Sequence, residues 1–598
     1  MEKKLRAIPL SDVDLLDGVL KERTAVNKKY LMSLKNENLL QNYYMEALLW
    51  TPSGKPEGCH WGWESPTSQV RGQFLGHWLS AAAILYCSEG DAEVKAKADY
   101  IVSELARCQR ENGGEWAAAI PEKYLHRIAE GKWAWASLYV VHKTFMGLLD
   151  MYEFAGNQQA LDIAVNFAKW FVRWTADFTQ EQMDNILETE TGGMFEVMAK
   201  LYATTKDPEH LQLMKRFERR RLFDRLISGE DALTRMHANT TIPEILGAAY
   251  AYDITGNDRW LKAVEAYWRC AVTERGYFCT GGQTNGELWC PPFEFAADLG
   301  ALNQEHCTVY NMMRLAQWLF VCTSDVKYAD YIERNIYNGI LAQQHPDMGI
   351  PTYFLPLGPG ARKKWDTLTE TFWCCNGTVL QANSIHESFI FYGDNQGVVI
   401  GQYFPAKLKI NINNTAVEIT QEHENWGHFS NVVKFTPPRP RRPKNLTVIV
   451  NVKCEQPTDF TLKLRIPRWV VGAPEVTVNG EESKDSFKDF YEIKRVWSND
   501  NVCVVFPKSL VCEPIPDKPD MIAFMDGPVV LAGLCENERA LFGSADNPEG
   551  MLRPADGSRM NKWTGNYITQ NQPENIKFMP LYEIVDERYT VYFPVKRP

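Results

Sequence analysis

The sequence lacks the features of a membrane or secreted protein. Its first twenty residues, MEKKLRAIPLSDVDLLDGVL, contain no apolar core and no cleavage site, and nowhere do 18 apolar residues run together. Cysteine is too sparse for a disulfide-stabilised fold, because 14 cysteines in 598 residues predict reduced thiols. These absences predict a cytoplasmic protein that does not associate with a membrane.

The sequence also has fewer basic than acidic residues and lacks the common nucleotide-binding motifs. Lys and Arg number 64 against 75 Asp and Glu, and the net charge of −11 argues against nucleic acid as a partner. A P-loop, a Rossmann glycine pattern and a GxSxG elbow are all absent, so nucleotide binding and serine-hydrolase chemistry have no motif support. Aromatic residues are plentiful, with 19 Trp, 25 Tyr and 28 Phe, which suits stacking on sugars although most should fill the core.

The length predicts two to four packed units, since a single core rarely exceeds about 250–300 residues. From about residue 70 to 345 one pattern returns: an apolar-periodic helix, a small polar turn and a second helix. The turns lie at Gly90, Gly156, Asp207, Gly256 and Asp325. They predict five helical hairpins, with a sixth either in the first 60 residues or around 370–390. Six such pairs would close a double ring, an (α/α)6 barrel.

Near residue 390 the hydropathy pattern changes to short segments in which apolar and polar residues alternate, such as KLKININ, NLTVIVNVK and FTLKLRI. Turns rich in Pro, Gly and Asn separate them. This pattern is typical of antiparallel β-sandwiches. We therefore expect a multi-domain chain, mainly α and then β: an (α/α)6 barrel catalytic domain at 1–390, a β-sandwich domain at 391–510 and a smaller β-rich domain at 511–598. The run PPRPRR at 437–442 is expected to be an exposed loop.

The densest cluster of reactive residues consists of Glu305 and Cys307 in NQEHCTVYN, with Cys374 and Cys375 in FWCCNGT. Three thiols and a carboxylate are ligands that Zn²⁺ accepts. If they meet at a metal, their charges leave an electron-rich site from which one sulfur can attack an electrophile. The alternative is that the cysteines are small core residues, because no CxxC spacing is present.

Other candidates are single residues. Glu287 in GGQTNGELW has glycines before it and a Trp after it, and we expect an apolar setting to raise its pKa toward that of a general acid. The alternative is a surface-loop Glu. His142 and His237 lie in or beside helical runs, where a lone His is more often a hydrogen-bonded core residue. Glu196 has a similar status, and Tyr353 is a weaker candidate.

The resemblance to a known family rests on many strings in a fixed order: VHKTFMGLLDMYEFAGN, GGMFEVMAKLY, HANTTIPE, GGQTNGE, EHCTVYNMMRLAQWLF, TYFLPLGPG and FWCCNGT. Together they are similar to glycoside hydrolase families 127 and 146, the β-L-arabinofuranosidase-like, zinc-dependent cysteine glycosidases, across most of the chain. The resemblance implies an (α/α)6 barrel followed by β-sandwich domains. It also implies a retaining exo-glycosidase that releases terminal β-L-arabinofuranose from small oligosaccharides or glycosides.

Residue roles follow from the same resemblance. It implies that Cys374 is the nucleophile and that Glu287 is the acid/base. The implied Zn²⁺ ligands are Glu305, Cys307, Cys374 and Cys375. The residues implied around the terminal sugar are His142, His237, Tyr353 and Glu196.

Two alternatives stay open. Where the second family commonly has His before the GGM turn, this chain has Thr191, which favours a hydrolase for another unusual pentose or deoxy sugar of pectic side chains. The chain could instead be a non-catalytic glycan-binding protein whose Cys/Glu cluster is a structural zinc site. A homo-oligomer is left open.

Overall fold

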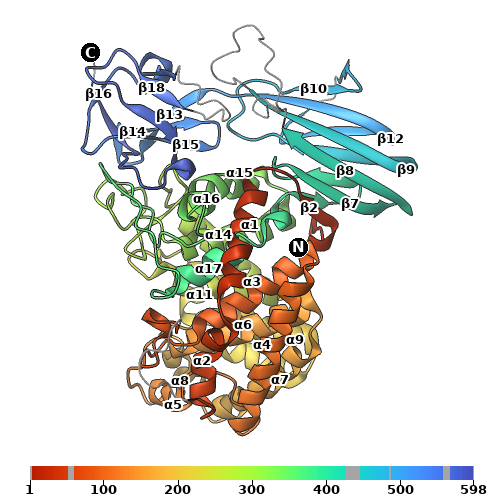
Figure 1. Ribbon diagram of the computed structural model, residues 1–598, viewed down its shortest axis with the longest axis vertical. Helices are drawn as coiled ribbons and strands as arrows, with labels where there is room; N and C mark the ends of the chain where they lie inside the picture. Colours follow the sequence, from red (N-terminus) through yellow and green to blue (C-terminus); the bar gives the residue numbers. More distant parts are fainter. Residues whose placement is uncertain (1–2, 51–58, 424–444, 484–486, 556–565, 597–598) are drawn as a thin grey trace.

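The computed structural model describes residues 3–50, 59–423, 445–483, 487–555 and 566–596. The helical region forms the lower half of the molecule, and two β regions lie side by side above it (Figure 1). The order of α and then β along the chain is as expected. The run PPRPRR at 437–442 lies outside the described residues.

Six helices of the described residues form an inner ring. These are α3 (Gln73–Glu89), α6 (Ser137–Ala155), α9 (Met194–Thr205), α12 (Ile242–Thr255), α14 (His306–Thr323) and α17 (Cys374–Ala382). Each packs on the next, and α17 returns to α3, so the ring is closed. Gly76 of α3 and Gly147 of α6 allow the closest approach, because a Cβ at either would collide with the backbone of the other helix.

The outer helices return the chain between inner ones. They are α1 (Val19–Ser33), α4 (Ala92–Glu111), α7 (Gln158–Ala176), α10 (Pro208–Arg216), α11 (Arg220–Ile227), α13 (Asp258–Trp268) and α15 (Val326–Asn335). Each predicted turn combines two caps. At one, Gly90 ends α3 in the left-handed conformation and the Asp91 side chain accepts from the first amides of α4. Gly156 with Asn157, and Gly256 with Asn257, repeat the arrangement.

The sixth helix pair uses both of the places predicted for it. Inner helix α17 comes from residues 374–382, and α1, from the start of the chain, packs against it and against α3. The two ends of the helical region therefore meet, which closes the ring. The prediction of an (α/α)6 barrel is confirmed.

The middle β region is built around two long antiparallel strands, β9 (Asn445–Arg465) and β12 (Phe490–Pro507). The first half of β9 pairs with β8 (Thr415–His423) and its second half with β6 (Gly397–Ile400). A register shift between Trp497 and Asn499 interrupts the β9–β12 ladder, and such irregularities let strands bend from one layer to another. The β6–β9 pair is parallel, an exception to the predicted antiparallel pattern.

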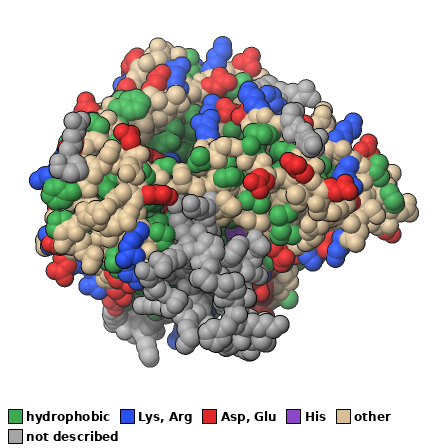
Figure 2. All heavy atoms as spheres, turned by 90° about the horizontal axis from the view of Figure 1, so that it is seen from above, with side chains coloured by type: hydrophobic (Ala, Val, Ile, Leu, Met, Phe, Trp, Pro, Cys, Tyr) green, Lys and Arg blue, Asp and Glu red, His purple; other side chains and the backbone are tan. Residues whose placement is uncertain are grey.

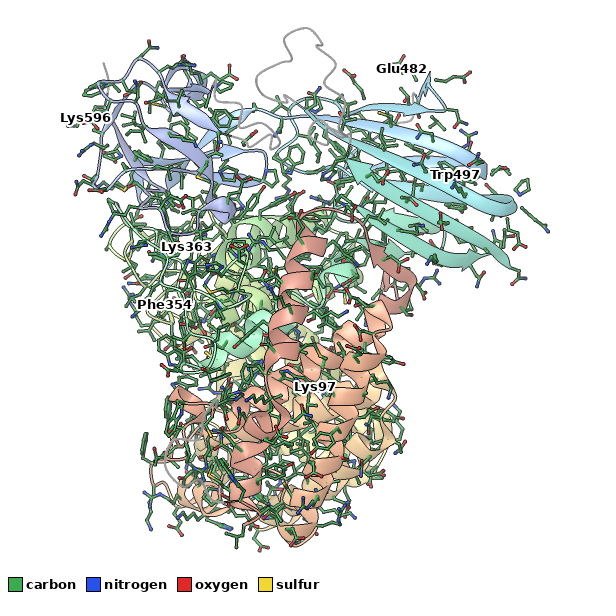
Figure 3. All side chains as sticks on the ribbon, in the orientation of Figure 1. Lys97, Phe354, Lys363, Glu482, Trp497 and Lys596 are labelled. Atoms are coloured by element: carbon green, nitrogen blue, oxygen red, sulfur yellow. The ribbon has the colours of Figure 1, made fainter. Side chains whose placement is uncertain are left out.

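Further strands complete this region: β1 (Arg6–Ala7), β2 (Val13–Leu15), β5 (Phe391–Gly393), β7 (Ala406–Ile412), β10 (Glu475–Val478) and β11 (Glu481–Glu482). The N-terminal strands join it because β1 pairs with β5 and β2 with β7. We propose to keep the domain divisions at 390 and 510 and to assign residues 6–15 to the second domain. Trp497, labelled in Figure 3, is fully buried and donates its indole N–H to the carbonyl of Phe460 at 2.9 Å.

The C-terminal β region contains β13 (Leu510–Ile515), β14 (Lys518–Asp526), β15 (Val529–Gly533), β16 (Leu541–Phe542), β17 (Leu552–Pro554), β18 (Tyr567–Thr569), β19 (Lys577–Pro580) and β20 (Phe593–Lys596). One face of it packs on barrel loops, where Leu355 and Leu357 share an apolar cluster with Met525 and Tyr589. Lys363, in the same loop segment (Figure 3), donates to the carbonyls of Leu581 and Ile584. This region therefore braces the segment between α16 (Leu341–Gln343) and α17.

The surface shows mixed charge. Lys and Arg side chains lie among Asp and Glu side chains over the face formed by the β regions (Figure 2). In the described part of the chain, no helix has the length and apolarity needed to cross a membrane.

Candidate active site

A pocket lies at the end of the barrel where the inner helices begin. Its lining includes Tyr139 near the start of α6, Gly192 before α9, Thr240 before α12, Glu305 before α14 and Cys374 at the start of α17. Helix N-termini carry partial positive charge and unpaired amide groups. Their convergence favours anionic groups at this end of the barrel.

The four predicted metal ligands meet in this pocket. The ligand atoms of Glu305, Cys307, Cys374 and Cys375 all lie within 4.8 Å of one another, and all four residues are buried. The Sγ atoms of Cys307 and Cys375 are 3.4 Å apart, and Cys374 Sγ is 3.9 Å from Glu305 Oε1. Tetrahedral ligands at the Zn–S distance of about 2.3 Å would be about 3.8 Å apart. The cluster therefore fits a four-coordinate metal ion.

Two neighbouring helices bring the cluster together. Glu305 is the N-cap of α14 and Cys307 lies in its first turn, while Cys374 and Cys375 open α17. Thr308 Oγ1 donates to Glu305 Oε2 at 2.9 Å, which orients the carboxylate. Cys307, Cys374 and Cys375 are unpaired thiols gathered at one point beside Glu305. This arrangement favours a metal site over the alternative that they are small core residues.

The electrostatics of the cluster call for a cation. Burial raises the pKa of Glu305 well above its usual value, and the hydrogen bond with Cys307 raises that of Cys374. Burial also opposes ionisation of Cys307, but hydrogen bonds from Cys374 and Cys375 lower its pKa to about 6. One negative charge is thus favoured, and ionising all four groups together requires a positive ion among them.

Glu287 stands at the tip of a short hairpin between β3 (Thr284–Asn285) and β4 (Leu288–Trp289). The two turn residues, Gly286 and Glu287, have φ of 56° and 67°. Two successive left-handed residues form a type I′ turn, which suits a two-residue hairpin. A non-glycine residue in this conformation is uncommon and often marks a functional site.

Tyr353 connects Glu287 to the cluster. Its hydroxyl donates to Glu287 Oε1 and also lies 3.3 Å from Cys374 Sγ. An O–H···O bond spans about 2.7 Å, so Oε1 and Sγ are at most about 6 Å apart. Retaining glycosidases hold their two reacting groups about 5–5.5 Å apart. On the other side, His237 Nε2 is 3.4 Å from Glu287 Oε2.

Two family profiles match this chain. The profile of "Beta-L-arabinofuranosidase, GH127 catalytic domain" matches residues 12–387, well over half of the chain, and that of the GH127 middle domain matches residues 397–508. The chain belongs to glycoside hydrolase family 127. The proposed nucleophile, the acid/base candidate and the metal cluster all lie within its catalytic domain.

Individual relatives agree with the family assignment. A non-reducing end beta-L-arabinofuranosidase of Bifidobacterium longum subsp. longum is 23% identical over 479 residues, covering 69% of this chain and 66%, just under two thirds, of that relative. A solved GH127 beta-arabinofuranosidase has a TM-score of 0.74 at 18% identity and covers 100% of this chain and 99% of its own. A GH127 beta-L-arabinofuranosidase from Geobacillus stearothermophilus T6 has a TM-score of 0.70 at 18% identity, covering 98% of this chain and 100% of its own. The solved structures share the fold from end to end.

The pKa of Glu287 corrects a prediction made from the sequence. Burial alone would raise it, as expected, but hydrogen bonds from His237 and Tyr353 outweigh burial and hold the pKa below its usual value. Burial would lower the pKa of His237, yet its contact with Glu287 raises it. Their contact thus favours a protonated His237 beside an ionised Glu287. The sequence could not reveal this, because the partners come from distant segments.

Two predicted sugar-binding residues lie away from the pocket surface. His142 is buried against Gly192 and Gly193, and neither ring nitrogen has a hydrogen-bond partner among the described residues. Glu196, in the first turn of α9, forms an ion pair with Arg314 and lines a second, larger cavity. Glu196 is not among the residues that line the pocket, although Gly192, just before the same helix, is.

Several pocket residues were missed by sequence reasoning. Glu190 lines the pocket beside His237 and Glu287, and burial raises its pKa. Trp63 and Trp135 form part of the wall, with ring centroids 5.0 Å apart. Nothing local marks Glu190 or Trp135 as functional, and in the sequence Trp63 is as compatible with core packing as with stacking on a sugar. Tyr139 is different, since it sits three residues before His142 on one helix, a spacing that places both on the same side.

Proposed function

We propose that this family 127 chain is a retaining exo-glycosidase that releases terminal β-L-arabinofuranose, with Cys374 as the nucleophile and Glu287 as the acid/base. The observation that carries the proposal is the Tyr353 hydroxyl, which joins Glu287 to Cys374 beside a buried metal-type cluster. The activities named for the relatives support the choice of sugar.

Glu305, Cys307, Cys374 and Cys375 would hold Zn²⁺, whose ligand preferences their donor set fits. When bound, the ion supplies the positive charge that keeps the thiols ionised near neutral pH. The position of Cys374 in the first turn of α17 adds to this, because the helix N-terminus favours a thiolate.

In the first step, the sulfur of Cys374 attacks the anomeric carbon while the glycosidic C–O bond breaks. The leaving oxygen takes the proton that His237 and Glu287 share, delivered from the Glu287 carboxyl. A thioglycosidic bond to Cys374 forms, and the alcohol departs. Tyr353 holds the carboxylate and the sulfur at a spacing suited to one glycosidic bond.

In the second step, Glu287 takes a proton from water, and the resulting hydroxide oxygen attacks the same carbon. The C–S bond breaks and the electron pair returns to the Cys374 sulfur. Two successive inversions give retention of configuration. The carboxylate form of Glu287, favoured by His237 and Tyr353, suits it to act as the base in this step.

The pocket has no room for more than one terminal sugar. The cavity has a volume of only about 50 Å³ in this structure, and Trp63 and Trp135 narrow it. His237 and Tyr353 would contact sugar hydroxyls next to the reacting groups. We also retain His142 as a sugar-binding residue, because its unpartnered nitrogens lie directly behind Gly192 and Gly193.

The test measures release of the aryl alcohol from an aryl β-L-arabinofuranoside. Cys374→Ser and Glu287→Gln should each lower kcat/KM by about 10³-fold or more, with bound zinc retained in the second variant. Cys535→Ser, a half-buried thiol in the C-terminal region, is the matched control and should retain full activity. Undiminished turnover by either active-site variant would overturn the mechanism.

One observation favours a second candidate sugar. The Thr191 side chain is fully buried and donates to Glu244, so it makes no contact in the pocket, and Glu190 offers a carboxylate instead. This supports a related hydrolase for another unusual pentose or deoxy sugar. A panel of aryl glycosides separates the two, since the preferred sugar will have the highest kcat/KM.

A further inference from the structure

A chain of buried hydrogen bonds runs from the pocket along the barrel axis. It begins at the hydroxyl of Tyr139, which lies 3.3 Å from His77 Nε2, and continues from His77 Nδ1 to Gln381 Oε1 at 2.6 Å. Gln381 Nε2 then donates to Ser80 Oγ at 2.8 Å, and Ser80 donates to Asp150. Its members alternate between α6, α3 and α17, so they link three inner helices.

Asp150, at the far end of this series of hydrogen bonds, determines which atom donates in each bond. The Asp150 carboxylate pairs with Lys200 Nζ at 3.2 Å and accepts from Ser80 Oγ. Ser80 must therefore give its proton to Asp150 and accept from Gln381. The same Gln381 amide nitrogen faces Met146 Sδ at 3.5 Å, which also accepts. The Gln381 oxygen is thus turned toward His77.

This direction determines the tautomer of His77. An oxygen acceptor faces Nδ1, so Nδ1 bears the hydrogen. The ring is fully enclosed, and burial lowers the pKa of His77 well below its usual value, so the ring is neutral. Nε2 therefore carries no hydrogen and can only accept from Tyr139.

The other inward neighbour of Tyr139 is also an acceptor. Gln73 donates its amide to the carbonyl of Phe372 at 2.7 Å, which turns its oxygen toward the Tyr139 hydroxyl at 2.9 Å. The Tyr139 hydroxyl has one proton and two buried acceptors, Gln73 Oε1 and His77 Nε2. Its proton is thus held inside the barrel, and only lone pairs of its oxygen remain for the pocket.

We propose that Tyr139 binds the terminal sugar by accepting a hydrogen bond from one of its hydroxyls, and that His77, Gln381, Ser80 and Asp150 are positioning residues that fix this orientation. The inference rests on the proposed function. The neighbouring Cys374 and Glu305, as metal ligands, are acceptors as well, so a sugar hydroxyl is the donor that this side of the pocket lacks.

The test is a double-mutant cycle in which one change is made in the enzyme and the other removes a hydroxyl from the substrate. Wild type and Tyr139→Phe are compared on an aryl β-L-arabinofuranoside and on its three monodeoxy analogues. Tyr139→Phe should lower kcat/KM for the parent about three- to tenfold, the value of one hydrogen bond. For one analogue, the loss should disappear, because the donor is already absent. An equal loss on all four substrates would overturn the inference.

Ser80→Ala tests the positioning residues without altering the pocket. It frees Gln381 to rotate, so a smaller loss of about two- to threefold is expected, and it should disappear with the same deoxy analogue. Thr175→Val, which removes a buried hydroxyl of outer helix α7, is the matched control. It should leave the ratio of kcat/KM between the parent substrate and each analogue unchanged. Should Tyr139→Phe fail to fold, Ser80→Ala alone decides, and a loss common to all substrates would contradict the proposal.

Failure here is distinguishable from failure of the proposed function. If Cys374→Ser is inactive while Tyr139→Phe affects all substrates equally, only the role of Tyr139 is overturned. If Cys374→Ser remains active while the deoxy analogue cancels the Tyr139→Phe loss, the mechanism is overturned and Tyr139 still binds the sugar.

Discussion

The two ends of the barrel differ in how they treat buried charge. At the end where the inner helices begin, Glu305 and three thiols lie together with no basic residue paired to them among the described residues. A much larger cavity of about 1260 Å³ extends to the other end and is lined by ion pairs, such as Lys200 with Asp150 and Lys3 with Asp253. We propose that the smaller pocket is the reactive one, because its four buried ionisable groups could hold a metal ion.

Helix direction explains part of this difference. N-termini favour anions, which suits thiolates and carboxylates, whereas the later turns of α9 and α14 carry the cations Lys200 and Arg314. Cavity size alone would favour the larger cavity, which does not contain the four ligand residues. Buried ionisable groups without a counter-ion are a better indicator of function than cavity size in this molecule.

The largest expected effect comes from breaking the metal cluster. Cys307→Ala removes one ligand, so bound zinc should fall well below one ion per chain and kcat/KM should drop by about 10³-fold. Metal content and turnover of an aryl β-L-arabinofuranoside are measured on the same sample. Cys322→Ala, a buried thiol deeper in α14, is the control and should retain both. Full zinc content in Cys307→Ala would contradict the assigned ligands.

A change in the larger cavity should affect stability instead of chemistry. Glu196→Gln leaves Arg314 buried without its counter-ion, which should lower the free energy of unfolding by about 3–5 kcal/mol. Urea unfolding measures this, and kcat should change by less than about twofold below the unfolding temperature. A large loss of kcat with unchanged stability would return Glu196 to the sugar site.

The pH dependence tests the shared proton of the pocket. Contact with Glu287 raises the pKa of His237, and the pair has its proton only below that value, so kcat/KM should fall as pH rises through it. His237→Asn removes the shared proton, and kcat/KM at neutral pH should drop about 10²-fold. Without His237, burial raises the pKa of Glu287, so the alkaline limb should reflect Glu287 alone. An unchanged profile in His237→Asn would contradict the pairing.

The smallest effect concerns Glu244, a buried acid near the start of α12. Burial raises its pKa to about 7. The folded state therefore holds a proton that the unfolded state has lost, and stability falls as pH rises from the unfolded pKa through the folded one. The loss between about pH 5 and 8 should be about 2 kcal/mol, and Glu244→Gln should remove it. Equal pH slopes of unfolding in the two proteins would show that Glu244 titrates normally.

The sequence predicts the barrel well because its signals are local. Gly90 followed by Asp91 is both a helix stop and a helix start, and the same pairing recurs at later turns. The sixth pair was ambiguous, since α1 and α17 are far apart in the chain and meet only when the ring closes.

The site was predictable in composition but not in electrostatics. Cys307 and Cys374 were identifiable as reactive types, and the resemblance implied that they meet. The lowered pKa of Glu287 depends on His237 and Tyr353, which approach it only in the folded chain. The resemblance implied that Glu196 contacts the sugar, and its ion pair with Arg314 could not be read from the sequence because the two residues are 118 positions apart.

The central claim is that the Cys374 sulfur forms the bond to the sugar. Glu287→Ala should slow the release of this intermediate, so an aryl β-L-arabinofuranoside with a good leaving group should load the variant with one sugar. Peptide mass spectrometry after brief incubation should find one pentosyl group on the peptide containing Cys374. A pentosyl group on a carboxylate, or none while the aryl alcohol is released, would contradict the account.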